Sequence, residues 1–537
     1  MYSRSKMRFV ALVIVCFIIT LSQVPPEAKA SLPSYYIVTL GGRANLFSAT
    51  VSGLLGAYDI FVSAMADPQA NGDPAINLYF AAARMANIIF REDGSTDSLR
   101  NLLASYGIIL TGDSFSSGRP DEIAISATVD LDDNIILPGD APDTEAVRSF
   151  LATSMISEID GALVNLAVIT NPNFQEIVPS LEINSDLNLE IDYGDVLLFR
   201  AGLKALKASI LSATAYDMDL DPHFLVTEIN SDNVNFRHIL DNFQDLLKLL
   251  PTSTTSGDGA AQLALAKTTL VAAITDYLTA SNAIRNDPGT QPGAEEFIEF
   301  GECRSREEGL FRELLTELRR SLQATDVAHV IMGREERWII HDTSDASKEM
   351  EVELLENEGD FWTIGDTRFI AWGGYVDCIQ ESGSTTTLSL EFWDSVDDQT
   401  CYGEATLTAT SITETTVSGN YSVNYFGSTA NCMGIQNGTF SGTREVGEET
   451  LNINLNQFFD NTPNLRDMLP DFDPQGQPLA GTMGHGLGDD PTLGGILISY
   501  EKDGEVTYFT QDYWTQKLHS QSGTRAMPWI PLLLLDD

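Results

Sequence analysis

The sequence predicts an α+β protein: a mainly α-helical array of tetratricopeptide-like helix pairs, with an inserted antiparallel β-sandwich or small barrel and a C-terminal β-hairpin. Three observations predict it. Apolar residues recur with a helical period of 3.6 through most of the first half of the chain, a period of two replaces it after Gln323, and an Asp-Gly turn near the end separates two short apolar runs. We place a signal peptide at 1–30, the helical array at 31–323, the β-rich insert at 333–446, and a return to the helical part with the hairpin at 447–537.

The first thirty residues have the order of charges and apolar residues found in a Sec-type signal peptide. Arg4, Lys6 and Arg8 precede an apolar run from Phe9 to Leu21, and a polar stretch then closes on Ala28-Lys29-Ala30. The run is short for a bilayer span, and the small residues before position 31 favour cleavage there. We therefore expect export to the periplasm or beyond the cell.

The amino-acid composition narrows the kinds of partner that the protein is expected to bind. The chain has 77 acidic against 31 basic residues, a formal net charge of −46, while 43% of its residues are hydrophobic. Such a charge repels phosphate backbones, so we expect no nucleic-acid partner, and cations are the natural counterparts. The apolar content is ample for folded cores, and the apolar end at residues 529–535 is too short to span a membrane in the mature chain.

Helix signals follow one another through the first half. An apolar stripe from Leu46 to Val62 predicts a helix that stops at Ala66-Asp67-Pro68, and Asp73-Pro74 predicts the cap and first turn of the next. Asp143-Thr144 is expected to cap a further helix. Later helices are predicted over 195–215, 233–250, 258–284 and 305–323.

Strand signals replace them in the insert. Leu388, Leu390 and Phe392 alternate with polar residues, and similar alternation recurs at near-regular spacing up to residue 446. From Leu451 the chain is predicted to return to helix or loop. Residues 496–500 and 506–509 are then expected to pair as a hairpin.

Four cysteines would remain after removal of the signal. An even number in an exported chain predicts two disulfides with three possible connectivities, of which we favour the pairing of Cys401 with Cys432. Their spacing matches no zinc pattern. The four candidates are Cys303, Cys378, Cys401 and Cys432.

Three segments share a further pattern: 190–207, 215–221, and 458–495 with its Leu465-Arg466-Asp467-Met468-Leu469-Pro470 and Asp490-Pro491-Thr492-Leu493-Gly494-Gly495 runs. These segments resemble a group of uncharacterised exported bacterial proteins with tetratricopeptide-like helical arrays. The resemblance covers scattered patches of about half the chain and implies no activity. It implies that 451–497 belongs with the helical part, which would make the β-rich block an insertion.

One acidic pattern resembles a calcium loop. Asp217, Asp219, Asp221 and Glu228 occupy positions one, three, five and twelve of an EF-hand-like spacing. Pro222, however, stands where that loop needs a residue with positive φ. We favour a helix end followed by an acidic turn, with calcium as the alternative and no other cofactor expected.

The sequence lacks the classical nucleophile motif and the zinc-protease motif. It contains neither G-x-S-x-G nor H-E-x-x-H, and Gly484-His485-Gly486-Leu487-Gly488 follows no apolar strand that would make it a phosphate loop. We expect a tight connection there with His485 exposed, followed by a turn at Asp490-Pro491. Enzymatic activity is left open, with the balance against it.

Aromatic residues of the insert are candidates for ligand binding. Trp362, Trp372 and Tyr375 stand near Gly373-Gly374, where backbone can approach a ligand, although aromatic residues of small sheets are more often core. The leading hypothesis is an exported, non-catalytic binding or scaffold protein with a protein or glycan partner. The alternatives are a secreted polysaccharide hydrolase or lyase and a calcium-dependent cell-surface assembly protein.

Overall fold

The structure is a computed structural model, and the chain divides into two compact units. The first unit comprises residues 1–298, 456–496 and 510–537, and the second comprises 299–455 and 497–509. The sequence boundaries differ from this division at the helix 305–324 and at residues 447–455 and 497–509, all of which belong to the second unit. The structure describes residues 34–48, 50–92, 97–111, 124–129, 136–183, 187–230, 235–252, 258–286, 293–300, 305–324, 326–355, 358–363, 373–382, 385–396, 399–426, 437–479, 481–502 and 504–520.

Short capped helices form the start of the first unit. Thr50 accepts from Gly53 N at the beginning of α3, and Asp73 accepts from Ala75 N and Ile76 N at the beginning of α5, which confirms the predicted cap at Asp73-Pro74. The helices are α2 (Ser34–Leu46), α3 (Val51–Ala64), α4 (Pro68–Asn71), α5 (Pro74–Phe90), α6 (Leu99–Ser105), α7 (Glu145–Phe150), the π-helix η2 (Leu151–Met155), α8 (Ile156–Leu166) and α9 (Ser180–Ile183).

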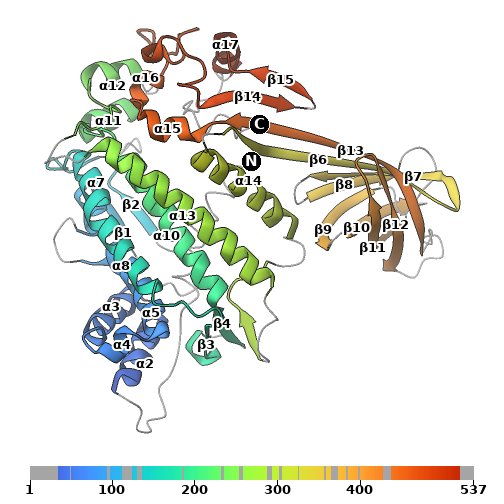
Figure 1. The fold of residues 1–537 in the computed structure, drawn as a ribbon, viewed down its shortest axis with the longest axis horizontal. Helices are drawn as coiled ribbons and strands as arrows, with labels where there is room; N and C mark the ends of the chain where they lie inside the picture. The colour runs from blue at the N-terminus through green and yellow to red at the C-terminus, as the bar shows by residue number, and fades with distance from the viewer. Residues whose placement is uncertain are drawn as a thin grey trace. The chain divides into compact units, whose positions relative to one another are not determined.

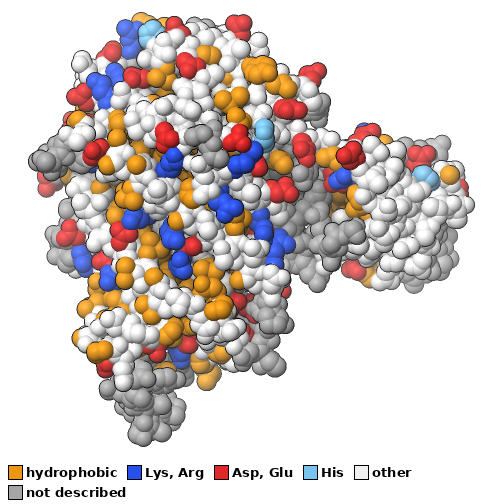
Figure 2. All heavy atoms as spheres, in the orientation of Figure 1, with side chains coloured by type: hydrophobic (Ala, Val, Ile, Leu, Met, Phe, Trp, Pro, Cys, Tyr) orange, Lys and Arg blue, Asp and Glu red, His pale blue; other side chains and the backbone are white. Residues whose placement is uncertain are grey.

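Two long helices, α10 (Tyr193–Thr214) and α13 (Gly259–Arg285), run side by side (Figure 1). Asp192 and Asp195 begin α10 with a reciprocal capping box. Lys204 Nζ on α10 pairs with Asp276 Oδ2 on α13 at 2.6 Å. On the face drawn in Figure 2, basic side chains lie among acidic ones instead of forming a single patch.

The remaining elements of the first unit are short. They are the strands β1 (Ile108–Thr111), β2 (Ala124–Ala127), β3 (Gln175–Val178), β4 (Asn188–Asp192) and β5 (Ala294–Glu296), the helices α11 (Pro222–Asn230), α12 (Phe236–Asn242), α15 (Leu455–Asn461), α16 (Leu465–Met468) and α17 (Gln511–Ser520), and the 3₁₀ turn η5 (His485–Leu487). β1 pairs with β2, and β4 lies between an antiparallel β3 and a parallel β5.

A buried ion cluster fixes the first helices to β3 and α9. Arg43 is 8% exposed, and its guanidinium donates to both carboxylate oxygens of Glu182 at 2.6 Å and to Glu176 Oε1 at 3.0 Å. The hydroxyl of Tyr79 donates to the same oxygen of Glu176 at 2.8 Å. Burial raises the pKa of the Glu176 carboxyl. A bidentate arginine pair of this kind is strong only while both partners remain.

The second unit is one large, curled antiparallel sheet with a helix, α14 (Ser305–Ala324). The strand order is β12-β11-β10-β9-β8-β7-β6-β13-β14-β15, and β12 also pairs with β13, so β6 to β13 form a closed ring of paired strands. The insert is thus a single sheet that curls on itself instead of two stacked sheets. The strands are β6 (Ala328–Asp342), β7 (Asp345–Leu355), β8 (Glu358–Thr363), β9 (Gly373–Ser382), β10 (Thr385–Val396), β11 (Gln399–Ile412), β12 (Thr416–Phe426), β13 (Asn437–Ile453), β14 (Leu497–Lys502) and β15 (Glu505–Tyr508).

Apolar side chains cover one face of the curled sheet, because apolar and polar residues alternate along its strands. Leu388, Leu390 and Phe392 are each 2% exposed or less, as their period of two predicts, and Trp338 is fully buried against Phe440. The intervening side chains are more exposed and form its other face.

Three further sequence expectations differ from the structure. The helix predicted over 233–250 is limited to α12, because the main chain of Leu247 and Lys248 pairs with Asp217. Thr144 does not cap α7 with its side chain, since its hydroxyl accepts from Leu220 N instead. The return to helix or loop at Leu451 comes later, because β13 continues to Ile453 between β6 and β14.

The signal peptide predicted at 1–30 lies outside the described residues. Within the described part of the chain, no helix has the length and apolar character needed to cross a bilayer.

Candidate functional site

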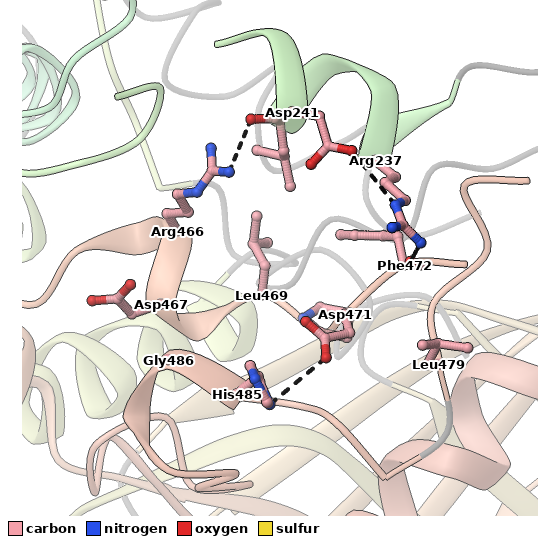
Figure 3. A pocket seen from close by; sticks show the side chains of 12 residues that line it. Arg237, Asp241, Arg466, Asp467, Leu469, Asp471, Phe472, Leu479, His485 and Gly486 are labelled. Atoms are coloured by element: carbon pink, nitrogen blue, oxygen red, sulfur yellow. Dashed lines mark hydrogen bonds and ion pairs between the residues drawn. The ribbon is translucent and has the colours of Figure 1, made fainter. Parts of the chain in front are cut away.

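A pocket of about 410 Å³ opens in the first unit between α12 and the segment that follows α15. Figure 3 shows Arg237 and Asp241 on α12 across the pocket from Asp471 and His485, with the side chain of Leu469 between them. The residues that line it are Arg237, Leu240, Asp241, Arg466, Asp467, Leu469, Pro470, Asp471, Phe472, Leu479, His485 and Gly486. Concave sites with convergent polar groups are where ligands bind most often.

The first wall is α12, and side-chain caps hold both of its ends. At its start, Asn235 accepts from His238 N at 3.0 Å and donates to the carbonyl of Pro474. At its end, Arg466 donates to the carbonyls of Leu240 at 2.9 Å and Phe243 at 3.1 Å. Because the last carbonyls of a helix have no partner within it, Arg466 fixes the end of α12 and the wall of the pocket together.

The second wall is the turn around η5. Gly484 and Gly488 have φ of 70° and 78°, which favours glycine at both positions. A Cβ on Gly484 would lie 2.2 Å from the carbonyl oxygen of Asp490, and one on Gly486 would lie 2.6 Å from Cα of Asp467. The close approach of Gly486 to α16 brings His485 to the pocket rim. Asp490 accepts from Thr492 N and Gly494 N, so the predicted turn at Asp490-Pro491 is confirmed.

The basic side chains of the rim have acidic or carbonyl neighbours. Arg237 donates to the carbonyl of Phe472 at 3.1 Å, and its Nε lies 3.5 Å from Asp241 Oδ2. Nδ1 of His485 lies 2.9 Å from Asp489 and 3.7 Å from Asp471. The hydrogen bond to Asp489, together with the charges of both carboxylates, raises the pKa of His485 above its ordinary value.

These rim groups remain open to solvent and hence to a ligand. The side chains of Arg237 and His485 are 47% and 57% exposed, and those of Asp241 and Asp471 are 67% and 48% exposed. The exposed position predicted for His485 is confirmed. Apolar side chains of Leu240, Leu469, Phe472 and Leu479 line the pocket beside these polar groups.

The predicted calcium residues lie in the first unit in separate local contacts. Asp217 accepts from Asp219 N, and Asp221 accepts from His223 N at the start of α11. Glu228 lies 2.6 Å from Nδ1 of His238. Among the described residues, no group of three or more acidic, histidine or cysteine side chains is arranged to hold a metal ion, and calcium binding stays a prediction.

The predicted aromatic site of the insert is described only in part. Tyr375 lies on β9, is 36% exposed, and donates its hydroxyl to Glu391. The side chain of Trp362 on β8 and the whole of Trp372 lie outside the described residues.

Most of the predicted disulfide cysteines also lie outside the described residues. Cys378 is buried in β9. Cys303, Cys432 and the side chain of Cys401 lie outside the described residues, so the pairing stays a prediction.

Sequence reasoning missed most of the pocket. It identified the turn around His485, but not Arg237 and Asp241, which lie on a helix whose predicted length was wrong. Their spacing of four on one helix face was the available signal. No protein-family model, curated protein or solved structure matches the chain.

Proposed function

We propose that this chain is an exported, non-catalytic binding protein that holds a neutral, hydroxyl-rich ligand, a soluble sugar, in the pocket between α12 and η5. One observation carries the proposal. Exposed guanidinium, imidazole and carboxylate groups converge on one concavity, each basic group beside an acidic or carbonyl neighbour. Such a rim offers both donors and acceptors and no large excess of either charge.

Sugar hydroxyls suit this rim because each can donate and accept. A hydroxyl could donate to Asp241 or Asp471 while accepting from Arg237, and each such bond to a charged group is stronger than a neutral one. The ring of Phe472, packed 5.9 Å from that of Phe236, supplies an apolar surface for the C–H face of a sugar.

Charged ligands fit less well. An anion would meet Asp241, Asp467 and Asp471 in a chain of net charge −46. A cation would compete with Arg237, Arg466 and His485 for the same carboxylates. A pocket of about 410 Å³ is in the range of small-molecule sites.

Two further parts of the proposal rest on sequence. Export follows from the signal-peptide pattern of residues 1–30, and the helix pairs of the first unit are taken as a tetratricopeptide-like array. Arrays of this type present extended surfaces to partners, in keeping with a binding role.

A thermal-shift screen of residues 31–537 tests the proposal. Neutral mono- and disaccharides are compared with glucuronate and glucosamine, because a ligand that prefers the folded state raises its melting temperature by mass action. We expect a saturable rise with at least one neutral sugar. Arg237→Ala and Asp471→Asn should abolish it, while Lys248→Ala, which removes an exposed cation outside the pocket, should retain it. A flat panel, or a rise with the charged sugars alone, would contradict the proposal.

A further inference from the structure

Exposed aromatic side chains gather on the outer face of the curled sheet. Tyr402 on β11 and Phe426 on β12 stand directly opposite each other, are 53% and 39% exposed, and have ring centroids 6.4 Å apart. Two residues further along β11, a second cross-strand row runs over β9, β10 and β11. It consists of Tyr375, Glu391 and Glu404. We call these five residues the acidic aromatic face.

The placement of these side chains follows from the alternation of the strands. Phe392 and Gly403 between them are buried, whereas Glu391, Tyr402 and Glu404 are exposed. Aromatic side chains of this size are normally buried, and an exposed group of them on a rigid sheet indicates an interaction surface.

Charge distinguishes this face from a glycan platform. Glu391 and Glu404 are direct cross-strand partners, and like charges in that position destabilise a sheet. A cation placed between them would relieve this repulsion. The faces of the neighbouring rings attract cations as well, through their quadrupoles.

The sequence around the acidic aromatic face also carries only negatively charged side chains. No Lys, Arg or His occurs from Phe369 to Thr443, although this span supplies all of β9 to β12. Its acidic residues are Asp377, Glu381, Glu391, Asp394, Asp397, Asp398, Glu404 and Glu414. A basic partner would meet a single-signed field over these strands, which favours encounter and orientation.

We infer that the acidic aromatic face docks an arginine- or lysine-containing segment of a partner protein. A guanidinium stacks on Tyr402 and Phe426 and donates to Glu391 and Glu404. This surface lies in the second unit and is independent of the sugar pocket proposed for the first.

Fluorescence anisotropy with residues 31–537 and a fluorescein-labelled Gly-Arg-Gly-Arg-Gly peptide tests the inference. We expect saturable binding that weakens about tenfold in Tyr402→Ala/Phe426→Ala, a change that leaves the charge unaltered. Glu391→Gln/Glu404→Gln should weaken it at least as much. The matched control Glu445→Gln/Glu505→Gln removes two exposed carboxylates of the same unit that lie outside residues 369–443, and it should leave the dissociation constant within about twofold.

Three results would overturn the inference. Equal weakening by both glutamine pairs would show attraction to the net charge alone, and unchanged binding in the aromatic variant would exclude the rings. Binding of neutral oligosaccharides, lost in Tyr402→Ala, would reassign the face to glycans. Arg237→Ala reports separately on the pocket, since peptide binding should survive that change. Circular dichroism melts confirm that each variant is folded.

Discussion

The guanidinium of Arg466 donates to the carbonyl oxygen of Leu240 over 2.9 Å, joining residues 226 positions apart in sequence. A second bond to Phe243 makes one side chain the cap of α12 and one wall of the pocket. The integrity of the proposed binding site therefore depends on this side chain.

Removal of this cap should loosen the pocket. Arg466→Ala leaves two partly buried carbonyls without their charged donor, and we expect a loss of about 2 kcal/mol in the stability of the first unit. Arg466→Lys should recover only part of it, because an ammonium cannot reproduce the two-pronged geometry. Urea unfolding followed by far-UV circular dichroism measures both. Equal stability of all three proteins would mean that the cap is dispensable.

The titration of His485 should depend on Asp489. Because the folded-state pKa is raised, the protonated ring stabilises the folded protein below the unfolded pKa of about 6.5, and this contribution is lost as the pH rises through the folded pKa. NMR titration of the ring should give a midpoint above 6.5 in the wild type and a lower one in Asp489→Asn. Asp245→Asn, outside the pocket, should leave the midpoint unchanged. A wild-type midpoint at or below 6.5 would refute this local electrostatic account.

Two glycines of the η5 turn separate backbone conformation from close packing. Gly488→Ala meets no atom within 4 Å, so it should cost only the left-handed conformation, about 1–2 kcal/mol. Gly484→Ala has a similar φ but also meets the carbonyl of Asp490 at 2.2 Å, and should cost clearly more and weaken sugar binding. Melting temperatures of the two variants decide this, and equal losses would argue against the packing role of Gly484.

The buried ion cluster should dominate the stability of the first helices. Glu182→Ala leaves Arg43 buried without its bidentate partner, at an expected cost of about 3 kcal/mol. Glu92→Ala breaks an exposed pair with Arg100 and should cost less than about 0.5 kcal/mol. Hydrogen exchange in α2 and α3 should rise only in the first variant. Comparable protection in both would show that the cluster contributes little.

Local signals predicted the elements that local physics determines. The cap at Asp73-Pro74, the helical period over 195–215 and the alternation around Leu390 each predict a helix or strand from neighbouring residues alone. The structure contains all three elements. The predicted helix over 233–250 is wrong beyond Asn242, because residues 247–250 take main-chain partners at 215–217. Such distant pairings leave no trace in the periodicity.

The site was less predictable for the same reason. His485 stood out because glycines flank it, whereas Arg237 and Arg466 are ordinary surface charges in sequence and converge only in the folded first unit. Abundant carboxylates also hid Asp241 and Asp471, since 77 acidic residues offer many pairs.

The most direct test of the central claim follows the imidazole resonances of residues 31–537 during titration with a neutral sugar that raises the melting temperature. Among the side chains that the structure describes, His485 is the one histidine in the pocket lining. The account therefore predicts a saturable shift of the His485 signal that is lost in Arg237→Ala and kept in Lys248→Ala. A sugar that binds and stabilises the protein while the His485 signal stays fixed would contradict it.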